Sequence, residues 1–336
     1  MISLPFRHAL VAGLLIAALP GAALAQAGTL EQSLVSLRLL DERVANIGHR
    51  LAVASRDFCP ERQWLPGFAV HDLSQYQGEY RRAAIRAFGL SSEPAVLAIV
   101  AGGPAERAGL RRDDVLLRLD GEALPAPPRS GGSFAQMERI LDALERAFAD
   151  GSATVEVRRD GAALQLPVAG DSGCPTRFQL VPARRMNASA DGRYVQITTG
   201  IANYVRDDDE LAAILAHEFA HNVLRHRVRL DAARVARGFF GNFGGSARRI
   251  RETEVEADRF SVYLLDRAGF DPRGAVRFWS RFGGRGLNFL GTPTHPNSRR
   301  RVALLQAEIA EIDRARAAGT TPMPAFLAPA PAVSDR

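Results

Sequence analysis

The longest apolar run of the chain lies at its N-terminus, and this placement limits how the remaining residues can fold. A basic pair at residues 7–8 precedes an alanine- and leucine-rich stretch that ends in the small-x-small pattern of residues 23–25. This pattern is typical of a secretory signal peptide, so residues 1–25 are predicted to be removed and Gln26 to begin the mature chain. An uncleaved N-terminal membrane anchor is the alternative. The sequence therefore predicts an exported, periplasmic protein with no second run long enough to span a bilayer.

The composition agrees with a globular chain. Of 336 residues, 46% are apolar and 24% are charged, which fits about two domains with cores of ordinary size. All 43 basic residues are arginine, and the net charge of +6 is spread along the sequence. We therefore expect no nucleic-acid partner. Peripheral association of a basic face with acidic lipid is kept as an alternative.

Export changes how the two cysteines are interpreted. Cys59 and Cys174 are the only cysteines, and each is followed by proline. In an oxidising compartment such a pair is more often a disulfide than a metal site or a nucleophile. We therefore predict a Cys59–Cys174 disulfide that closes the ends of the segment between them. Two reduced thiols are the alternative.

The segment between the cysteines has the pattern of a small β-rich domain. An apolar strand, a glycine turn and a short helix come first, and a second strand closes at Asp120-Gly121. An amphipathic helix then leads to two strands joined by a hairpin turn at Asp160-Gly161. This order resembles a PDZ domain of the bacterial envelope-protease type, predicted over residues 77–170.

The PDZ resemblance implies a peptide-binding site. Phe88, Gly89 and Leu90 would form the loop whose backbone N–H groups receive the terminal carboxylate of a protein chain. The peptide would then add as a strand beside Val96 to Val100. A PDZ fold that serves only as a spacer or lid is the alternative.

A second motif, HEFAH, indicates metal chemistry. Asp207, followed three residues later by glutamate, is a capping-box pattern that begins a helix over residues 208–227. On this helix His217 and His221 lie one turn apart on one face, so both can bind one zinc ion. Glu218 flanks that ion and is placed to remove a proton from the attacking water.

A catalytic zinc usually has a third protein ligand, and three glutamates downstream compete for this role. Glu254 and Asp258 share one helix face, whereas Glu252 and Glu256 share the opposite one. Only the first pair combines a ligand-length carboxylate with a shorter one that can accept the Nδ1 hydrogen of a ligating histidine. Glu254 is therefore predicted as the ligand, with Glu252 or Glu256 as alternatives.

These motifs together resemble the gluzincin metallopeptidases of the HtpX and CAAX prenyl protease group, in a soluble, exported form. The resemblance rests on HEFAH, the Glu254-x-x-Ala-Asp258 pattern and the stretch THPNSRRRVALL. It implies one Zn²⁺ per chain and a metalloendopeptidase that cleaves proteins or peptides. It also implies that His295 lies near the zinc as a catalytic or gating group, with a purely structural role as the alternative. Arg301 would lie behind the site, where it orients the cleft or only pairs with a carboxylate. His226 is about 140° from the His221 face and is predicted to cap or face solvent.

The predicted fold class is α+β, with a mainly helical zincin-type domain, a small edge sheet and an inserted PDZ domain. The predicted role is cleavage of misfolded or unassembled envelope proteins, with substrates recruited through exposed C-termini. An envelope chaperone and an intramembrane protease are the alternatives, and the lack of a second membrane-length run disfavours the latter. The predicted parts are a signal peptide (1–25), an N-terminal helical segment on the protease domain (26–76), the PDZ domain (77–170), the metallopeptidase domain (171–318) and an Ala/Pro-rich flexible tail (319–336).

Overall fold

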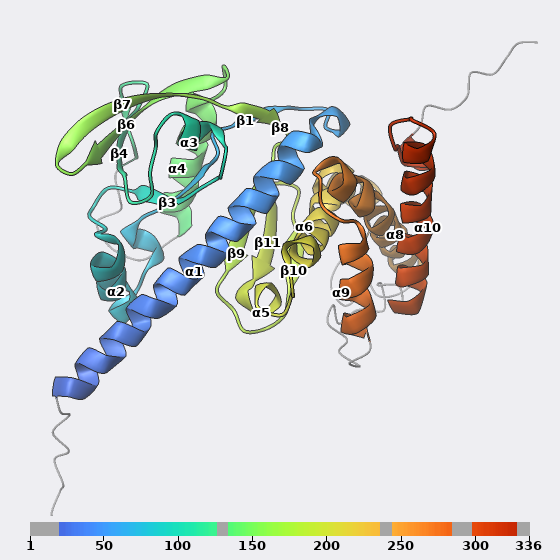
Figure 1. Ribbon diagram of the computed structural model, residues 1–336, viewed down its shortest axis with the longest axis horizontal. Coiled ribbons are helices and arrows are strands. Elements are labelled where there is room, and N and C mark those ends of the chain that lie inside the picture. Colours follow the sequence, from blue (N-terminus) through green and yellow to red (C-terminus); the bar gives the residue numbers. More distant parts are fainter. Residues whose placement is uncertain (1–19, 126–133, 236–243, 284–297, 328–336) are drawn as a thin grey trace, which may run out of the picture.

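The structure is a computed structural model that describes residues 20–125, 134–235, 244–283 and 298–327 (Figure 1). Most of the predicted signal peptide and the predicted site residue His295 lie outside these ranges. Every helix among the described residues is too short or too polar to cross a membrane. The structure combines helices with three sheets, so the predicted α+β class is confirmed.

The long helix α1 (Pro20–Ala54) runs diagonally between a sheet-rich part and a helix-rich part (Figure 1). Toward the sheet, Arg38 pairs with Asp113 at 2.6 Å, and the side chain of Asn46 accepts a hydrogen bond from the Ala101 N–H at 2.9 Å. Toward the helices, Val44, Ile47 and Leu51 are buried in the largest core, and Leu51 is fully buried. One helix therefore holds both parts together.

The sheet-rich part is the PDZ-like segment. Its six-stranded antiparallel sheet has the order β2-β3-β4-β6-β7, and β5 pairs with β4. Apolar residues of its strands and of α4 form a core in which Val96, Leu116, Ile140 and Val155 are fully buried. The elements are β2 (Phe68–His71), α2 (Gly78–Phe88), β3 (Ala95–Ile99), α3 (Pro104–Arg107), β4 (Val115–Leu119), β5 (Glu122–Ala123), α4 (Phe134–Ala147), β6 (Ser152–Arg159) and β7 (Ala162–Ala169), with the 3-10 turn η2 (Leu73–Gln75) before α2.

Two details of the PDZ prediction are wrong. The sheet begins with β2, where Phe68 pairs with Ile99, so it starts before the predicted boundary at residue 77. Because β3 has β2 on one side and β4 on the other, no edge is left beside Val96 for an added peptide strand. The outer edge of the sheet at this end, within the described residues, belongs to β2.

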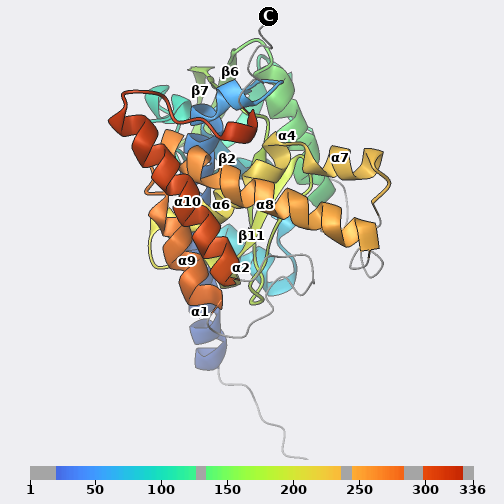
Figure 2. The same cartoon turned by 90° about the vertical axis from the view of Figure 1, so that its right-hand side faces the viewer.

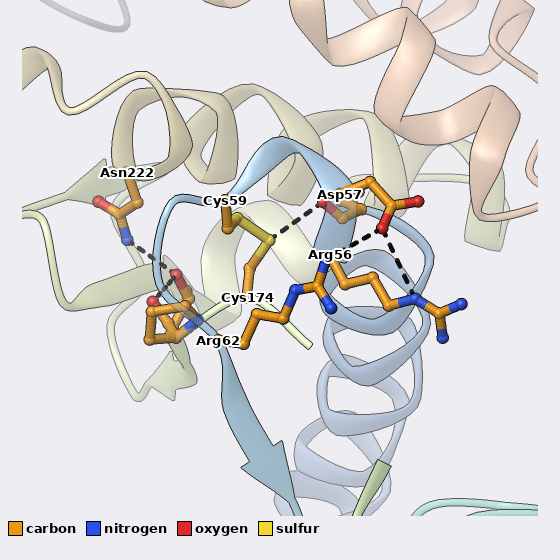
Figure 3. Close-up of a disulfide and its surroundings, with 9 residues drawn as sticks. Arg56, Asp57, Cys59, Arg62, Cys174 and Asn222 are labelled. Carbon is orange, nitrogen blue, oxygen red and sulfur yellow. Dashed lines mark hydrogen bonds and ion pairs between the residues drawn. A yellow bond between two sulfur atoms is a disulfide. The ribbon is translucent and has the colours of Figure 1, made fainter. Parts of the chain in front are cut away.

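The ends of this segment meet as the cysteine argument expects. Strand β1 (Gln63–Leu65) pairs antiparallel with β8 (Asp171–Gly173), which places the entry and the exit of the segment side by side. Directly outside that pair, Cys59 and Cys174 form the predicted disulfide, with a Cα–Cα distance of 5.6 Å (Figure 3). The insertion is therefore closed at its base by a strand pair and a covalent bond.

The helix-rich part is built around α6, which is buried along almost its whole length. Helices α8 and α9 pack against it and α10 packs against both of them (Figure 2), while the sheet β10-β11-β9 covers its other side. The elements are η1 (Arg56–Phe58), β9 (Arg177–Val181), β10 (Ala188–Ala190), β11 (Tyr194–Thr198), α5 (Thr199–Ala202), α6 (Asp208–Val223), α7 (His226–Ala232), α8 (Gly244–Arg267), α9 (Arg273–Gly283), α10 (Ser298–Ala317) and η4 (Ala325–Leu327).

Part of the predicted flexible tail is ordered on this core. Phe326 in η4 contacts the ring of Phe260 edge-on, and the Arg259 guanidinium lies over the Phe326 ring. The prediction of a flexible tail rested on its alanine- and proline-rich composition. It overlooked Phe326, whose ring packs on the core and anchors the first half of the tail.

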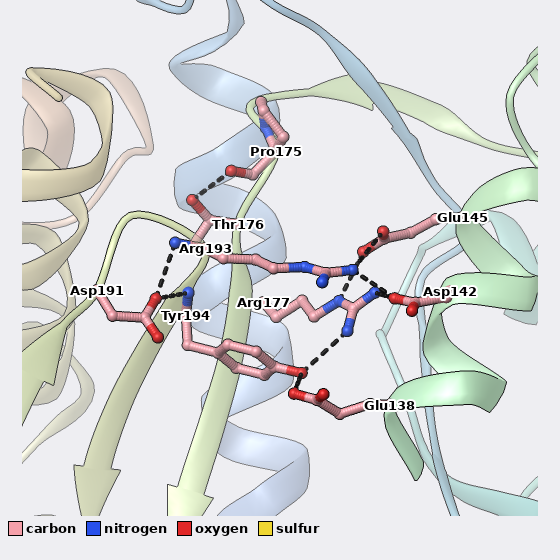
Figure 4. A network of polar contacts seen from close by, with 9 residues as sticks. All are labelled: Glu138, Asp142, Glu145, Pro175, Thr176, Arg177, Asp191, Arg193 and Tyr194. Carbon is pink, nitrogen blue, oxygen red and sulfur yellow. Dashed lines mark hydrogen bonds and ion pairs between the residues drawn. The ribbon is translucent and has the colours of Figure 1, made fainter. Parts of the chain in front are cut away.

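A polar network also joins the two parts directly, through side chains of α4 and β9 (Figure 4). Arg177 on β9 donates to Asp142 and Glu145 of α4, each at 2.6 Å, and to the Tyr194 hydroxyl at 2.9 Å. Arg193 also pairs with Asp142. The acidic face of the PDZ helix α4 is thus bound to the sheet that borders α6.

Candidate metal centre

Helix α6 begins as predicted at Asp207, whose side chain accepts a hydrogen bond from the Glu210 N–H at 2.8 Å. The Glu210 carboxylate does not complete the capping box. It accepts from the Arg206 N–H at 2.9 Å and pairs with Arg281. The helix nevertheless starts where it must to place both motif histidines on one face.

Three ligand-type atoms converge between α6 and α8. The Nε2 atoms of His217 and His221 are 3.4 Å apart, and Glu254 oxygens lie 3.4 Å from the first and 3.6 Å from the second. His217 and Glu254 are buried and His221 is partly buried. Two imidazole lone pairs and a carboxylate that face one point are a donor set for a cation, and two histidines with a glutamate are a common zinc set. The residues present therefore fit zinc.

The competing glutamates point elsewhere. Glu252 is exposed and lies 3.8 Å from Arg248, while Glu256 pairs with Arg229 at 2.6 Å. Of the three glutamates, Glu254 is the one that lies within ligand distance of both motif histidines. This geometry agrees with the choice of Glu254 from its position on the same helix face as Asp258.

Asp258 lies behind the first histidine. Its Oδ1 is 2.9 Å from Nδ1 of His217, and its Oδ2 accepts from Nε of Arg301 at 2.6 Å. All three side chains are buried, and the Arg301 guanidinium also lies over the Trp279 ring at 3.8 Å. Burial disfavours the charged form of His217, but the Asp258 carboxylate outweighs it and raises the pKa of the imidazole. Asp258 is thus placed to accept the Nδ1 hydrogen of His217, which leaves Nε2 to face Glu254.

Glu218 lies next to this set and is 7% exposed. Burial raises the pKa of its carboxyl to about 7. A general base is most effective when its pKa lies near the working pH. The environment of Glu218 thus suits a group that takes up and releases one proton.

His226 is not where the sequence predicts it. The prediction continued one helix to residue 227, but α6 ends at Val223 and Arg225 adopts a left-handed conformation with φ +54°. This turn brings His226, at the start of α7, back beneath His221, and the side chain is 2% exposed. The Nδ1 atoms of the two rings are 2.9 Å apart. A break before His226, at Leu224-Arg225, has no signal in the sequence itself.

A cleft of about 200 Å³ opens beside the centre, lined among others by His221, His226, Arg227 and Ala190. Ala190 ends β10, the edge strand of the three-stranded sheet. Asn222 of α6 fixes that edge because its amide oxygen accepts from the Gly192 N–H at 2.8 Å. The cleft therefore lies between an exposed strand edge and the metal-ligand set.

The predicted carboxylate-binding loop is not accessible. Phe88 and Leu90 are 6% and 4% exposed, and both pack in a small core with Leu34 of α1. Gly89 has a left-handed φ of +64°, and its N–H is bonded to the Ile85 carbonyl. These residues end helix α2 and hold it to α1, so the prediction of a peptide loop at Phe88–Leu90 is wrong.

The fold and the centre define a helical zincin-type domain joined to a PDZ domain. Residues 162–250 and 243–309 match peptidase family M48, and residues 96–159 match the PDZ domain family. The chain therefore carries a peptidase domain of family M48, a zinc metallopeptidase family, and a PDZ domain.

Relatives with curated descriptions match the peptidase region. Mitochondrial metalloendopeptidase OMA1 of Schizosaccharomyces pombe is 31% identical over 142 residues, which cover 36% of this chain and 42% of the relative. A beta-barrel assembly-enhancing protease of Yersinia pestis is 29% identical over 133 residues, which cover 31% of this chain and 27% of the relative. The chain thus spans less than half of the length of these relatives.

Among solved structures, one match is to a PDZ domain. The HtrA3 PDZ domain bound to a phage-derived ligand aligns at 17% identity over 33% of this chain and 89% of that chain, with a TM-score of 0.24. A score this low carries no argument about the present molecule.

Proposed function

We propose that the protein is a zinc-dependent endopeptidase of the bacterial cell envelope that hydrolyses misfolded or unassembled proteins. The observation that carries the proposal is the convergence of His217, His221 and Glu254 with Glu218 beside them. In this proposal the first three residues hold one Zn²⁺, and Glu218 is the general base. Asp258 and Arg301 orient His217 from behind.

Zinc would supply a Lewis acid that polarises the scissile carbonyl and makes water nucleophilic near neutral pH. Glu218 would remove a proton from the attacking water and deliver it to the leaving amine, and the raised pKa of its buried carboxyl suits both transfers. An extended substrate adds beside β10, whose edge faces the cleft. His295 retains the catalytic or gating role that the family resemblance implies.

The PDZ domain is proposed to bind extended peptide ends at β2 in place of the loop at Phe88–Leu90. Strand β2 lies at the edge of the six-stranded sheet within the described residues, so one side of its backbone can pair with an added strand. Gly67 precedes it with φ +76°, and a Cβ there would lie 2.8 Å from Pro104. Only glycine fits this turn before β2, and we propose that the turn receives the terminal carboxylate of the peptide.

The envelope location is proposed from three features. The N-terminal sequence has the signal-peptide pattern, and a relative is named a beta-barrel assembly-enhancing protease. The Cys59–Cys174 disulfide suits an oxidising compartment. The periplasm is therefore the proposed site of action, with cleavage after residue 25.

The experiment compares wild-type protein with Glu218→Gln on an unfolded protein such as reduced casein. The proposed activity requires degradation by wild type, inhibition by a chelator, and loss of at least about 10²-fold in the variant, as is usual when a general base is removed. If Glu218→Gln suppresses aggregation of the casein as well as wild type does, and neither protein cleaves it, the protein acts as a chaperone and the peptidase proposal is wrong.

A further inference from the structure

The two histidines of the metal centre are supported differently. Behind His217, a carboxylate lies directly against Nδ1, at 2.9 Å in Asp258. Behind His221, the partner of Nδ1 is another imidazole nitrogen, Nδ1 of His226, also at 2.9 Å. Two nitrogens can share a hydrogen bond only if one carries the proton and the other does not.

The surroundings decide which nitrogen carries it. Nε2 of His221 faces the ligand cluster, 3.4 Å from Nε2 of His217 and 3.6 Å from Glu254. A neutral imidazole that offers the Nε2 lone pair carries its proton on Nδ1, so His221 donates and Nδ1 of His226 accepts. The proton of His226 is then on Nε2, which lies 3.2 Å from a Glu256 oxygen.

This series of hydrogen bonds from His221 through His226 ends at an ion pair between Glu256 and Arg229. The two oxygens of Glu256 accept from Arg229 at 2.6 and 3.1 Å, a bidentate pair. The Arg229 guanidinium can only donate, so both Glu256 oxygens are acceptors, and one of them can also receive the Nε2 hydrogen of His226. Every hydrogen bond between Arg229 and His221 therefore has one donor and one acceptor.

A break in the helix brings His226 into this series of hydrogen bonds. Arg225, with its left-handed φ of +54°, breaks the helix between His221 and His226 and starts α7. On an uninterrupted helix, five residues would place these rings about 140° apart. The break instead puts a 2% exposed His226 between α6 and α8.

We propose that His226 is a positioning residue for the metal centre. Through its bonds to His221 and Glu256, it holds His221 in the tautomer and ring orientation that present Nε2 to the metal. The inference rests on the proposed function, because it takes His221 as a zinc ligand. Outer partners of this kind typically change metal affinity by about 10- to 100-fold.

The test measures zinc affinity of the full-length protein by competition with a chromophoric chelator. His226→Phe keeps an aromatic ring but loses both nitrogens, and we expect zinc to bind about 10- to 100-fold more weakly. His226→Gln can accept with its oxygen and donate with its nitrogen, so it should recover most of that loss. Glu252→Gln is the matched control, because it lies one turn before Glu256 on α8 and is exposed. It should bind zinc like wild type.

The nitrogen-15 spectrum of zinc-loaded wild type gives a second readout, which does not depend on whether the variants fold. We expect His221 to be protonated at Nδ1 and His226 at Nε2. Protonation of His226 at Nδ1, or wild-type zinc affinity in His226→Phe, would overturn the positioning role alone. Failure of wild type to bind zinc, or zinc binding that survives His221→Ala, would instead overturn the proposed function.

Discussion

The metal centre and the PDZ-like segment differ in how their sites are built. Each predicted ligand lies within one turn of a partner on the same helix, at His217 and His221 on α6 and at Glu254 and Asp258 on α8. The PDZ site depends instead on which strand is left at a sheet edge and on what α1 covers. Helical spacing fixes local neighbours, whereas an edge is defined only after the whole sheet has formed.

Removal of the metal should give the largest effect and should separate the two regions. A chelator is expected to lower hydrolysis of a short peptide by about 10³-fold or more, and added zinc should restore it, because the ligand set supplies the reactive centre. Binding of a C-terminal peptide, measured by fluorescence anisotropy, should stay within about twofold. Loss of both would mean that the centre also holds the PDZ domain in place.

Removal of the disulfide tests how much the closure at the base of the inserted segment contributes to the stability of the protein. In the chain-entropy model, a loop of 115 residues contributes roughly 4 to 5 kcal/mol, less any strain. The Cys59→Ser/Cys174→Ser double variant should therefore unfold at lower urea concentration by a corresponding amount. The β1–β8 pair remains as the second closure. An unchanged midpoint would show that this pair closes the insertion without help.

Phe88 should behave as a core residue. Phe88→Ala is expected to lower the free energy of unfolding by about 3 kcal/mol or more, since the ring is 6% exposed in the α1–α2 core. Ile85→Ala is the control on the same helix, where the side chain is 43% exposed and the expected loss is below about 1 kcal/mol. If Phe88→Ala instead retains full stability and loses peptide binding, the loop at Phe88–Leu90 is a binding site after all.

The network between α4 and β9 should give the smallest effect. Arg177→Gln removes a largely buried cation from two carboxylates and is expected to cost about 1 to 2 kcal/mol. Arg193→Gln removes a half-exposed partner of the same carboxylates and should cost below about 1 kcal/mol. Urea denaturation of both variants measures the difference. Equal losses would mean that burial of Arg177 does not strengthen the contact between the two parts.

Much of the peptidase region could be predicted because helical spacing and residue chemistry leave few alternatives. The choice of Glu254 over Glu252 and Glu256 needed only helix geometry and side-chain length. The disulfide needed only the compartment and the count of cysteines. In both cases the chemistry of the residue types limited the alternatives to very few.

The errors arose where one backbone angle or one distant contact decides the outcome. The left-handed Arg225 moves His226 from a predicted surface position to the underside of His221, and arginine gives no sequence signal for such a turn. Leu34 of α1 covers Phe88 from far away in the chain. Hydrophobic periodicity and helix propensity predict that a helix forms, but they do not predict which residues pack against its end.

The measurement that tests the central claim most directly is the zinc content of purified protein for three matched variants. We expect about one zinc per chain in wild type, in Glu218→Gln and in Glu252→Gln, because neither substitution removes a ligand. Glu254→Gln should lose most of the metal, since a neutral amide replaces the carboxylate that faces both histidines. Full zinc content in Glu254→Gln, or loss of zinc in Glu252→Gln, would contradict the account of the metal centre.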